Sequence, residues 1–498
     1  MKLKRIRILL GSIFFLLTTL LFLDFTGTLH HWFGWMAKIQ FLPALLAMNF
    51  IVVAVLIALT LVFGRIYCSV ICPLGVFQDV VAWVHNRRKN HRYSYSKAVN
   101  WLRYAFLAVM VVALIAGIGS LVALLAPYSS YGRIASNLFQ PVYIAGNNVL
   151  AYFAERADSY AFYSVDVWIK SLPTFIIAAV TFVLIAVLAW RNGRTYCNTI
   201  CPVGTVLGFL ARFSWFKIYF DEEKCRSCSK CSKGCKASCI DFKTHTVDYS
   251  RCIVCGDCRL DCHFDALHYG RKKKAVRAEV QGNSHEDKDV DKSKRSFLLA
   301  TAMVSTAALA EEKMKLDGGL AVLKERKVWK RNTPLTPPGS MSADNMAQHC
   351  TGCQLCVAEC PNGVLRPSTD LMKLMQPTMS YERGFCRPEC TRCSELCPAG
   401  AIKPISREEK SSTQIGHAVW QPFNCIVLTD GVECGNCSRH CPAGAIEMVP
   451  NNPDDEESPY VPAVDETRCI GCGACEYVCP ARPFTAIHVE GHEVHKVN

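Results

Sequence analysis

Sixteen cysteines between residues 350 and 479 constrain what this chain can fold into more than any other feature. They form four groups of four, and every group ends in Cys-x3-Cys-Pro: Cys350, Cys353, Cys356, Cys360; Cys386, Cys390, Cys393, Cys397; Cys425, Cys434, Cys437, Cys441; and Cys469, Cys472, Cys475, Cys479. In iron–sulfur proteins, three closely spaced thiolates hold one cube, and the fourth, before proline, holds the partner cube. Disulfide frameworks lack this regular spacing, and structural zinc sites use two separated pairs. The segment therefore predicts four 4Fe–4S clusters, although the two middle groups depart from the strict spacing.

A second cysteine-rich segment, residues 216–270, has the pattern of a two-cluster ferredoxin. The spacing Cys-x2-Cys-x2-Cys-x3-Cys occurs twice in it, at Cys225, Cys228, Cys231, Cys235 and at Cys252, Cys255, Cys258, Cys262. By the crossover rule, Cys262 completes the first cube and Cys235 the second. Cys239 is spare and offers a replacement for Cys235. These two clusters bring the predicted number in the whole chain to six.

Residues 1–215 are apolar and contain only four of the 29 cysteines. Four apolar runs approach the roughly 20 residues that a helix needs to cross a bilayer: 8–23, 41–64, 104–126 and 173–190. Lysines and arginines gather before the first run and after the second and fourth, so the positive-inside rule places those ends in the cytoplasm and the 127–171 loop outside. The net charge of +13 therefore fits a multi-pass protein of a bacterial inner membrane better than a nucleic-acid binder.

An internal repeat follows the second and fourth apolar runs, as Arg65-x-Tyr-Cys68-x3-Cys72-Pro-x-Gly and as Arg194-x-Tyr-Cys197-x3-Cys201-Pro-x-Gly. Cysteines four residues apart share one face of a helix. If the two turns pack together, a further metal centre at the membrane edge is expected, with the ligands Cys68, Cys72, Cys197 and Cys201. Packed thiols without a redox role are the alternative.

Two linkers and a signal-like segment separate the cysteine-rich domains. Residues 271–292 are charged and nearly free of large apolar side chains, as in a solvated linker. Residues 293–311 have a basic start, a 14-residue apolar run and an Ala-x-Ala end, like a twin-arginine export signal with Lys294 in place of the first arginine. Cleavage after Ala310 would release the C-terminal domain; otherwise the run is a fifth, short span, or a buried helix without export. Residues 312–345 form a second linker that contains several prolines.

These features predict a multidomain protein. A helical membrane domain, residues 1–215, precedes two ferredoxin-like α+β iron–sulfur domains, residues 216–270 with two clusters and residues 346–498 with four. Residues 216–292 are expected in the cytoplasm, and residues 312–498 are expected in the periplasm.

The repeated motif, followed by a two-cluster unit, resembles the NapH-like membrane subunit of periplasmic nitrate reductase systems and the membrane part of the nitrous-oxide reductase regulator. The chain from Ser293 onward resembles a NapG-like exported ferredoxin, so the whole looks like a fusion of the two. The resemblance implies that the membrane part oxidises quinol and that the exported part passes electrons to an extracytoplasmic reductase or carrier. It also implies nested pairing of the four groups, in which Cys360 and Cys479 exchange places as fourth ligands, as do Cys397 and Cys441.

The expected function is electron transport by a membrane-bound iron–sulfur protein of the quinol dehydrogenase type in anaerobic respiration. An assembly or maturation factor for a respiratory metalloenzyme, or a redox regulator, is the alternative. The terminal acceptor, the direction of electron flow and the catalytic residues do not follow from the sequence. His30 and His31 are candidate proton acceptors by position alone, and a surface role is the simpler expectation for both.

Overall fold

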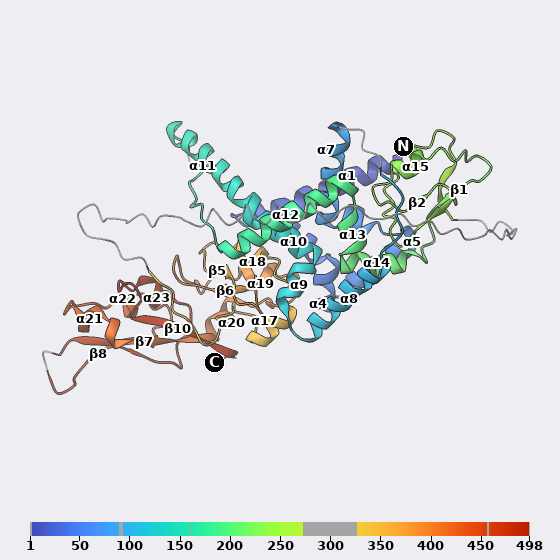
Figure 1. The fold of residues 1–498 in the computed structure, drawn as a ribbon. Helices are drawn as coiled ribbons and strands as arrows, with labels where there is room; N and C mark the ends of the chain where they lie inside the picture. The colour runs from blue at the N-terminus through green and yellow to red at the C-terminus, as the bar shows by residue number, and fades with distance from the viewer. Residues whose placement is uncertain (1, 89–92, 160, 272–325, 456–457, 498) are drawn as a thin grey trace, which may run out of the picture.

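The computed structural model describes residues 2–88, 93–159, 161–271, 326–455 and 458–497 (Figure 1). The signal-like segment 293–311 lies outside these residues, as do nearly all of the charged linker and the first part of the second linker. The described chain comprises a helical region (residues 2–211), a two-cluster module (217–270) and a C-terminal module (326–497). The two modules lie at opposite ends of the helical region (Figure 1).

The helical region consists of helices of very different lengths. Their bounds are α1 (Lys2–Leu23), α2 (Thr28–Phe33), α3 (Trp35–Lys38), α4 (Phe41–Leu46), α5 (Phe50–Phe63), α6 (Tyr67–Val70), α7 (Pro73–Arg88), α8 (Asn100–Ile115), α9 (Gly119–Leu125), α10 (Pro127–Ile134), the π-helix η1 (Ala135–Phe139), α11 (Gln140–Arg156), α12 (Leu172–Asn192), α13 (Thr195–Thr199) and α14 (Pro202–Ala211). Helix α1 packs against α6 and α7, and α12 packs against α7 and α10. The two short helices that carry the repeated cysteines, α6 and α13, therefore lie among the long ones.

Two of the four predicted spans are long enough to cross a membrane. Residues 4–23 of α1 and the whole of α12 are sufficiently long and apolar. The predicted span 41–64 is divided between α4 and α5, and the predicted span 104–126 is divided between α8 and α9. Helices α5 and α8 have 14 and 16 residues, hence lengths of about 21 and 24 Å against a hydrocarbon core of about 30 Å. The structure does not support four unbroken spans.

Local backbone features account for both breaks. Met48 adopts a left-handed conformation with φ 53°, and the Asn49 side chain accepts a hydrogen bond from Val52 N and so starts a new helix. Gly117, with φ 68°, ends α8 in the same left-handed region. An apolar run does not reveal such breaks, because the residues on both sides remain apolar.

The two-cluster module contains two small antiparallel sheets and two single-turn helices. Strand β1 (Lys217–Phe220) pairs with β4 (Leu267–Gly270), and β2 (Ile240–Asp241) pairs with β3 (Thr246–Val247). Helix α15 (Lys230–Lys233) carries Cys231, and α16 (Asp257–Leu260) carries Cys258. Elements this short bury few apolar side chains between them, so the cysteine sites occupy the interior of the module.

The C-terminal module repeats this construction on a larger scale. Its elements are α17 (Ala343–His349), α18 (Leu355–Ala358), β5 (Leu365–Pro367), β6 (Pro377–Met379), α19 (Arg392–Leu396), α20 (Arg407–Ser412), β7 (Thr413–Trp420), the 3-10 helix η2 (Pro422–Asn424), α21 (Ile426–Thr429), α22 (Asn436–Arg439), β8 (Ile446–Pro450), β9 (Tyr460–Val464), α23 (Ala474–Val478) and β10 (Ile487–Val497). The antiparallel pairs are β5–β6, β7–β10 and β8–β9. Both modules therefore have the short α+β elements of ferredoxin-type domains.

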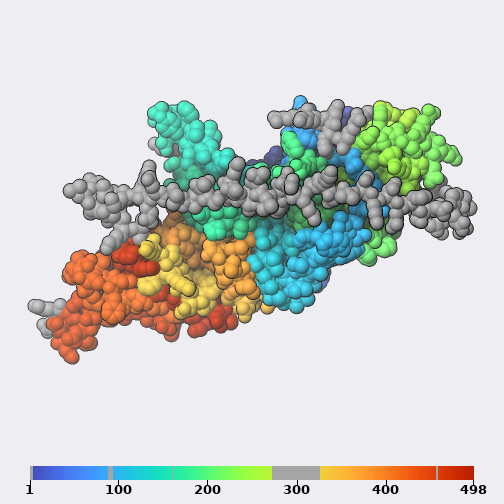
Figure 2. Space-filling view, viewed as in Figure 1, coloured from blue at the N-terminus to red at the C-terminus, as the bar shows by residue number. Residues whose placement is uncertain are grey.

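The C-terminal module is docked directly on the helical region, as the space-filling view shows (Figure 2). Asn137 Nδ2 donates to Gln354 Oε1 at 2.8 Å, and Gln140 Nε2 donates to the Ala358 carbonyl at 3.1 Å. Gly132 of α10 lies so close to the backbone at Cys353 that an added Cβ would overlap the Cys353 carbonyl oxygen. The first cysteine group of this module is thus part of the interface.

Candidate iron–sulfur sites

The two-cluster module gathers its cysteines in two separate sets. Cys225, Cys228, Cys231 and Cys262 line one small cavity together with several phenylalanines. Burial and the neighbouring thiolates of the same set raise the pKa of Cys231 to about 11. The structure therefore brings together the four cysteines that the spacing assigns to the first cube.

The second set contains Cys235, with Cys239 beside it. Cys235 is a charged neighbour of Cys252, Cys255 and Cys258, the other three predicted ligands. Cys239 Sγ lies 3.5 Å from Cys235 Sγ, and its hydrogen bond lowers the pKa of Cys235 to about 7. Cys239 also hydrogen-bonds Cys252. Cys235 and Cys239 both lie at this set, so Cys235 as the fourth ligand stays a prediction, with Cys239 as the alternative.

In the C-terminal module the first two cysteine groups pair with each other. Burial, and then the charge of Cys397 among others, raises the pKa of Cys353 to about 12, and Cys397 is likewise a charged neighbour of Cys350 and Cys356. Cys360 is the corresponding neighbour of Cys386 and Cys393 in the second group. The predicted exchange partners of Cys360 and Cys397 were Cys479 and Cys441, so this part of the predicted pairing is wrong.

The third and fourth groups pair in the same way. Cys479 shares a cavity with the first three cysteines of group three, and Cys441 shares one with the first three of group four: Cys425, Cys434, Cys437 and Cys479; Cys441, Cys469, Cys472 and Cys475. The module therefore brings its cysteine groups together as two consecutive pairs rather than as a nested set. Consecutive pairing avoids the long loop from Cys360 to Cys469 that the outer nested pair would close, and a shorter loop costs less conformational entropy.

The arrangement of the sulfurs bears on whether each cysteine set holds a zinc ion or a 4Fe–4S cluster. Four thiolates around one zinc ion, with Zn–S bonds of about 2.3 Å, lie about 3.8 Å apart. Within the described ranges, the one set of three metal-ligating groups within 4.8 Å of one another contains Asp24, His30 and Glu359, and no cysteine. Backbone amides also point at the sulfurs, as Ala486 N does at Cys479 Sγ (3.2 Å). Cysteine quartets whose sulfurs accept backbone N–H donors fit 4Fe–4S clusters.

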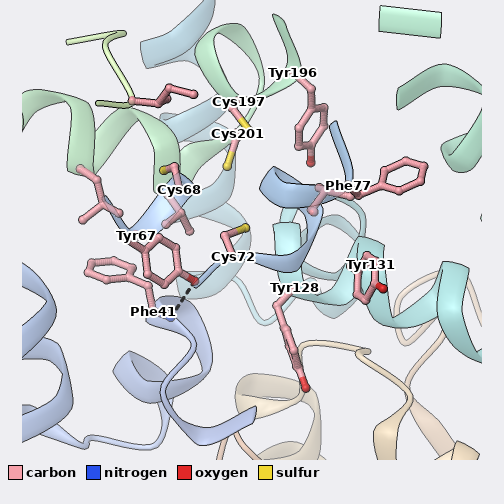
Figure 3. Packing of buried hydrophobic residues seen from close by; sticks show 14 of the residues in the cluster. Phe41, Tyr67, Cys68, Cys72, Phe77, Tyr128, Tyr131, Tyr196, Cys197 and Cys201 are labelled. Carbon is pink, nitrogen blue, oxygen red and sulfur yellow. Dashed lines mark hydrogen bonds between the residues drawn. The ribbon is translucent and has the colours of Figure 1, made fainter. Parts of the chain in front are cut away.

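The repeated turns α6 and α13 bring the remaining four cysteines together inside the helical region (Figure 3). Each of these side chains is 4% exposed, and all belong to one buried cluster: Cys68, Cys72, Cys197 and Cys201. We call them the central quartet. Its assembly matches the geometric premise of the predicted further metal centre, and what it holds is a proposal taken up below.

Two fully buried arginines cross-link the repeats reciprocally. Arg65 Nη2 donates to the Cys197 carbonyl at 3.2 Å and approaches Cys68 Sγ at 3.7 Å. Arg194 Nη1 donates to the Cys68 carbonyl at 2.8 Å and approaches Cys197 Sγ at 3.8 Å. The guanidinium of each repeat thus holds the cysteine turn of the other and places positive charge beside two sulfurs, which favours an anionic occupant.

The Gly that closes each repeat has a steric reason. A Cβ at Gly75 would overlap the Cys68 carbonyl oxygen, and a Cβ at Gly204 would overlap the Cys197 carbonyl oxygen. The turn that carries each first cysteine therefore packs against the following helix at backbone distance. Arg, Cys, Pro and Gly in the motif belong to one local structure, which explains why they occur as a unit in both copies.

One buried polar set was missed by the sequence interpretation. His30 Nδ1 lies 2.9 Å from Glu359 Oε1, with side chains 5% and 1% exposed, so the expectation of a surface role for His30 is wrong. Asp24 completes the set and accepts hydrogen bonds from the amides of Gly27 and Leu29. His31 is exposed. No sequence signal connects His30 to Glu359, because their proximity arises from docking of the C-terminal module.

Comparisons with known proteins agree with these sites. A model described as a 4Fe-4S binding domain matches residues 45–91 and 172–220, which contain the central quartet. Models described as 4Fe-4S dicluster domains match residues 248–364 and 432–482. Comparison with solved structures finds no match.

Fold and sites together define an iron–sulfur electron-transfer protein with several ferredoxin-type units. The ferredoxin-type protein NapF of Escherichia coli is 27% identical over 182 residues, 36% of this chain and all of NapF. The methylamine utilization ferredoxin-type protein MauM of Methylobacillus flagellatus is 30% identical over 166 residues, 32% of this chain and 70% of MauM. The chain belongs to this family of ferredoxin-type proteins. It also matches the putative electron transport protein YccM of Escherichia coli at 25% identity over 43% of this chain, spanning 54% of YccM.

Proposed function

We propose that this protein conducts electrons across a membrane, from quinol to an acceptor on the far side, through iron–sulfur centres in both modules and in the helical region. The observation that carries the proposal is a single buried cluster of side chains. It contains cysteines of the two-cluster module, the whole central quartet and Cys353 of the C-terminal module. A continuous, dry interior between redox centres is what a conducting protein needs.

Specific contacts join the three parts of this route. Arg65, which holds the central quartet, also donates from Nη1 to the Ser250 carbonyl, two residues before Cys252. Lys236, directly after Cys235, forms an ion pair with Asp79 at 3.1 Å, and Asp79 also pairs with Arg194. On the other side, Tyr128 is buried and points from the quartet toward the C-terminal module (Figure 3). The sites are fixed relative to one another by buried polar contacts.

The groups proposed for the six module sites are 4Fe–4S clusters, which supply reversible uptake of one electron each. For the central quartet we propose a seventh iron–sulfur centre. Its support is the four buried thiols and the two guanidinium groups beside them. The chain itself contributes ligands, burial and N–H donors that stabilise anionic sulfur.

The proposed location is a bacterial inner membrane, with the two-cluster module in the cytoplasm and the C-terminal module outside. Two apolar helices of spanning length, the basic residues at their cytoplasmic ends and the opposite placement of the modules support it. An extracytoplasmic reductase or electron carrier is the proposed recipient, by analogy with the NapH- and NapG-like proteins.

The test combines composition, spectroscopy and topology. The full chain is purified anaerobically, iron and sulfide are quantified, and electron paramagnetic resonance follows reduction by a short-chain quinol. We expect four irons for each of six clusters and additional iron that Cys68→Ser/Cys197→Ser removes. Reporter fusions after residues 271 and 498 should report opposite sides. Modules on the same side, or clusters that no benzoquinol or naphthoquinol reduces, would refute the proposal.

The alternative function, a maturation factor, predicts a different result for a strain that lacks this protein. Its partner reductase would be present but lack its metal. An electron carrier instead leaves a fully metallated reductase without electrons, and metal analysis of the purified partner separates the two functions.

A further inference from the structure

A cavity of about 280 Å³ lies where the helical region meets the two-cluster module. Leu59 and Phe63 of α5 and Ile66 shortly after it line the cavity, together with Val254, Cys255 and Tyr269 of the two-cluster module. The volume is near the lower end of the ~300–1,000 Å³ typical of small-molecule sites. A cavity of this kind suits a ring-sized ligand rather than a whole lipid.

Apolar surface surrounds the mouth of the cavity. Phe63 and Leu260 line it and are 38% and 43% exposed, and on α1 next to it Ile6 and Leu9 are 52% and 61% exposed. An exposed apolar belt of this kind at the end of a spanning helix faces lipid. A ligand dissolved in the membrane can therefore enter without crossing water.

Two of the cations at the cavity are ion-paired, and a third, Arg259, also lines it. Lys4 Nζ lies 2.8 Å from Asp257 Oδ1, and Arg7 Nη1 lies 3.3 Å from Asp79 Oδ2. The rest of the lining is mostly apolar, which favours a largely apolar ligand, and competition by an anionic lipid is one outcome of the test below.

Besides these cations, the cavity offers a further polar side chain to such a ligand. His268 lines the cavity, and its Nε2 is 3.9 Å from Asp221 Oδ2, too far for a hydrogen bond. Tyr269, in contrast, donates its hydroxyl to the Phe63 carbonyl at 3.1 Å. A carbonyl or hydroxyl group on a bound ring would find its partner in His268.

A predicted cluster ligand in the cavity lining indicates which class of ligand binds there. Cys255 is one of the predicted ligands of the second cube, and its position in the wall brings a ligand in this cavity next to an electron-transfer site. We propose that the cavity binds the ring of an isoprenoid quinone, hydrogen-bonded by His268, with the tail in the lipid. This inference rests on the proposed function and gives it a substrate site.

Photolabelling of the full chain in neutral phosphatidylcholine nanodiscs tests the site. The probe is a short-chain azidobenzoquinone, and labelled peptides are identified by mass spectrometry. We expect label in residues 54–66 and 252–270. Label elsewhere in the chain would overturn the proposal, as would displacement of the probe by added phosphatidylglycerol but not by unlabelled quinone.

Variants make the test quantitative. Leu59→Trp fills the cavity and should raise the Kd of the quinone about tenfold, equivalent to ~1.4 kcal/mol. His268→Phe removes one hydrogen bond and should raise it about fivefold, or ~1 kcal/mol. Val55→Trp is the control, because Val55 lies one turn earlier on α5 and is 52% exposed; we expect less than a twofold change. Iron content, measured in parallel, shows that each variant is folded.

The outcomes separate this inference from the proposed function. If quinone binds here but no cluster becomes reduced, the site stands and the electron-transfer proposal fails. If quinol reduces the clusters of Leu59→Trp with unchanged affinity, the proposed function stands and this site is wrong.

Discussion

Replacing Arg194 by lysine tests whether the reciprocal arginines hold the two cysteine repeats together. Arg194 Nε donates to Asp79 Oδ1 at 2.8 Å, and Nη2 lies 2.7 Å from Asp79 Oδ2. The third guanidinium nitrogen, Nη1, donates to the Cys68 carbonyl at 2.8 Å. One planar group thus serves a carboxylate and a carbonyl at once, in a side chain with no solvent exposure.

Lysine keeps the positive charge of Arg194 but not the planar arrangement of three nitrogens that makes these contacts. It can retain one contact to Asp79, so the second charge-assisted contact is lost, at about 1.5 kcal/mol. The Cys68 carbonyl loses its donor inside the protein, at about 1.5 kcal/mol more. We therefore expect the helical region to lose about 3 kcal/mol of unfolding free energy. For a unit of about 200 residues this lowers Tm by about 6–12 °C.

The assay is thermal unfolding of the purified chain in detergent, followed by circular dichroism of the helices. Arg191→Lys is the matched control, because Arg191 lies three residues away and is exposed; its Tm should match that of the unaltered chain. If Arg194→Lys unfolds at the same temperature as Arg191→Lys, the reasoning about the buried guanidinium is refuted.

Three further predictions concern the C-terminal module. Cys397→Ser should perturb the cluster of Cys350 and its neighbours, and Mössbauer spectra that show loss at the third group instead would restore nested pairing. Gly132→Leu should undock the module and expose it to protease because its side chain meets the Cys353 backbone, whereas Gly146→Leu should be silent because nothing lies within 4 Å of an added Cβ. Burial lowers the pKa of His495 from 6.5 to about 4. The unfolded chain then binds a proton that the folded chain excludes, so stability should fall as pH drops from 6.5 toward 4, and His495→Gln should flatten this dependence in denaturant titrations.

The kind of site could be predicted from the sequence better than which cysteine groups share a site. Cysteine spacing is a local property, because three predicted ligands of each cube come from a segment of at most 13 residues. The fourth ligand comes from another group, so choosing Cys397 rather than Cys479 for the first group needs the fold. The repeat likewise raised the hypothesis that Cys68 and Cys197 meet, but nothing in it indicates that Arg65 and Arg194 exchange partners between the copies.

Docking of the C-terminal module explains the largest disagreement, the two shortened spans. Both breaks face this module: Ala47, just before the α4–α5 break, lies against Gly400, and Ser120 N, just after the α8–α9 break, donates to the Met372 carbonyl. Unpaired backbone groups at membrane depth are tolerated where protein covers them. Helix α5 therefore begins, and helix α8 ends, at the C-terminal module, and the module occupies space that longer spans would fill. The partners lie more than 250 residues away in sequence, so hydropathy alone assigns to each span residues that belong to an interface. The same docking brings Cys353 into the core that contains the central quartet, so the shortened helices and the proposed electron route have one structural cause.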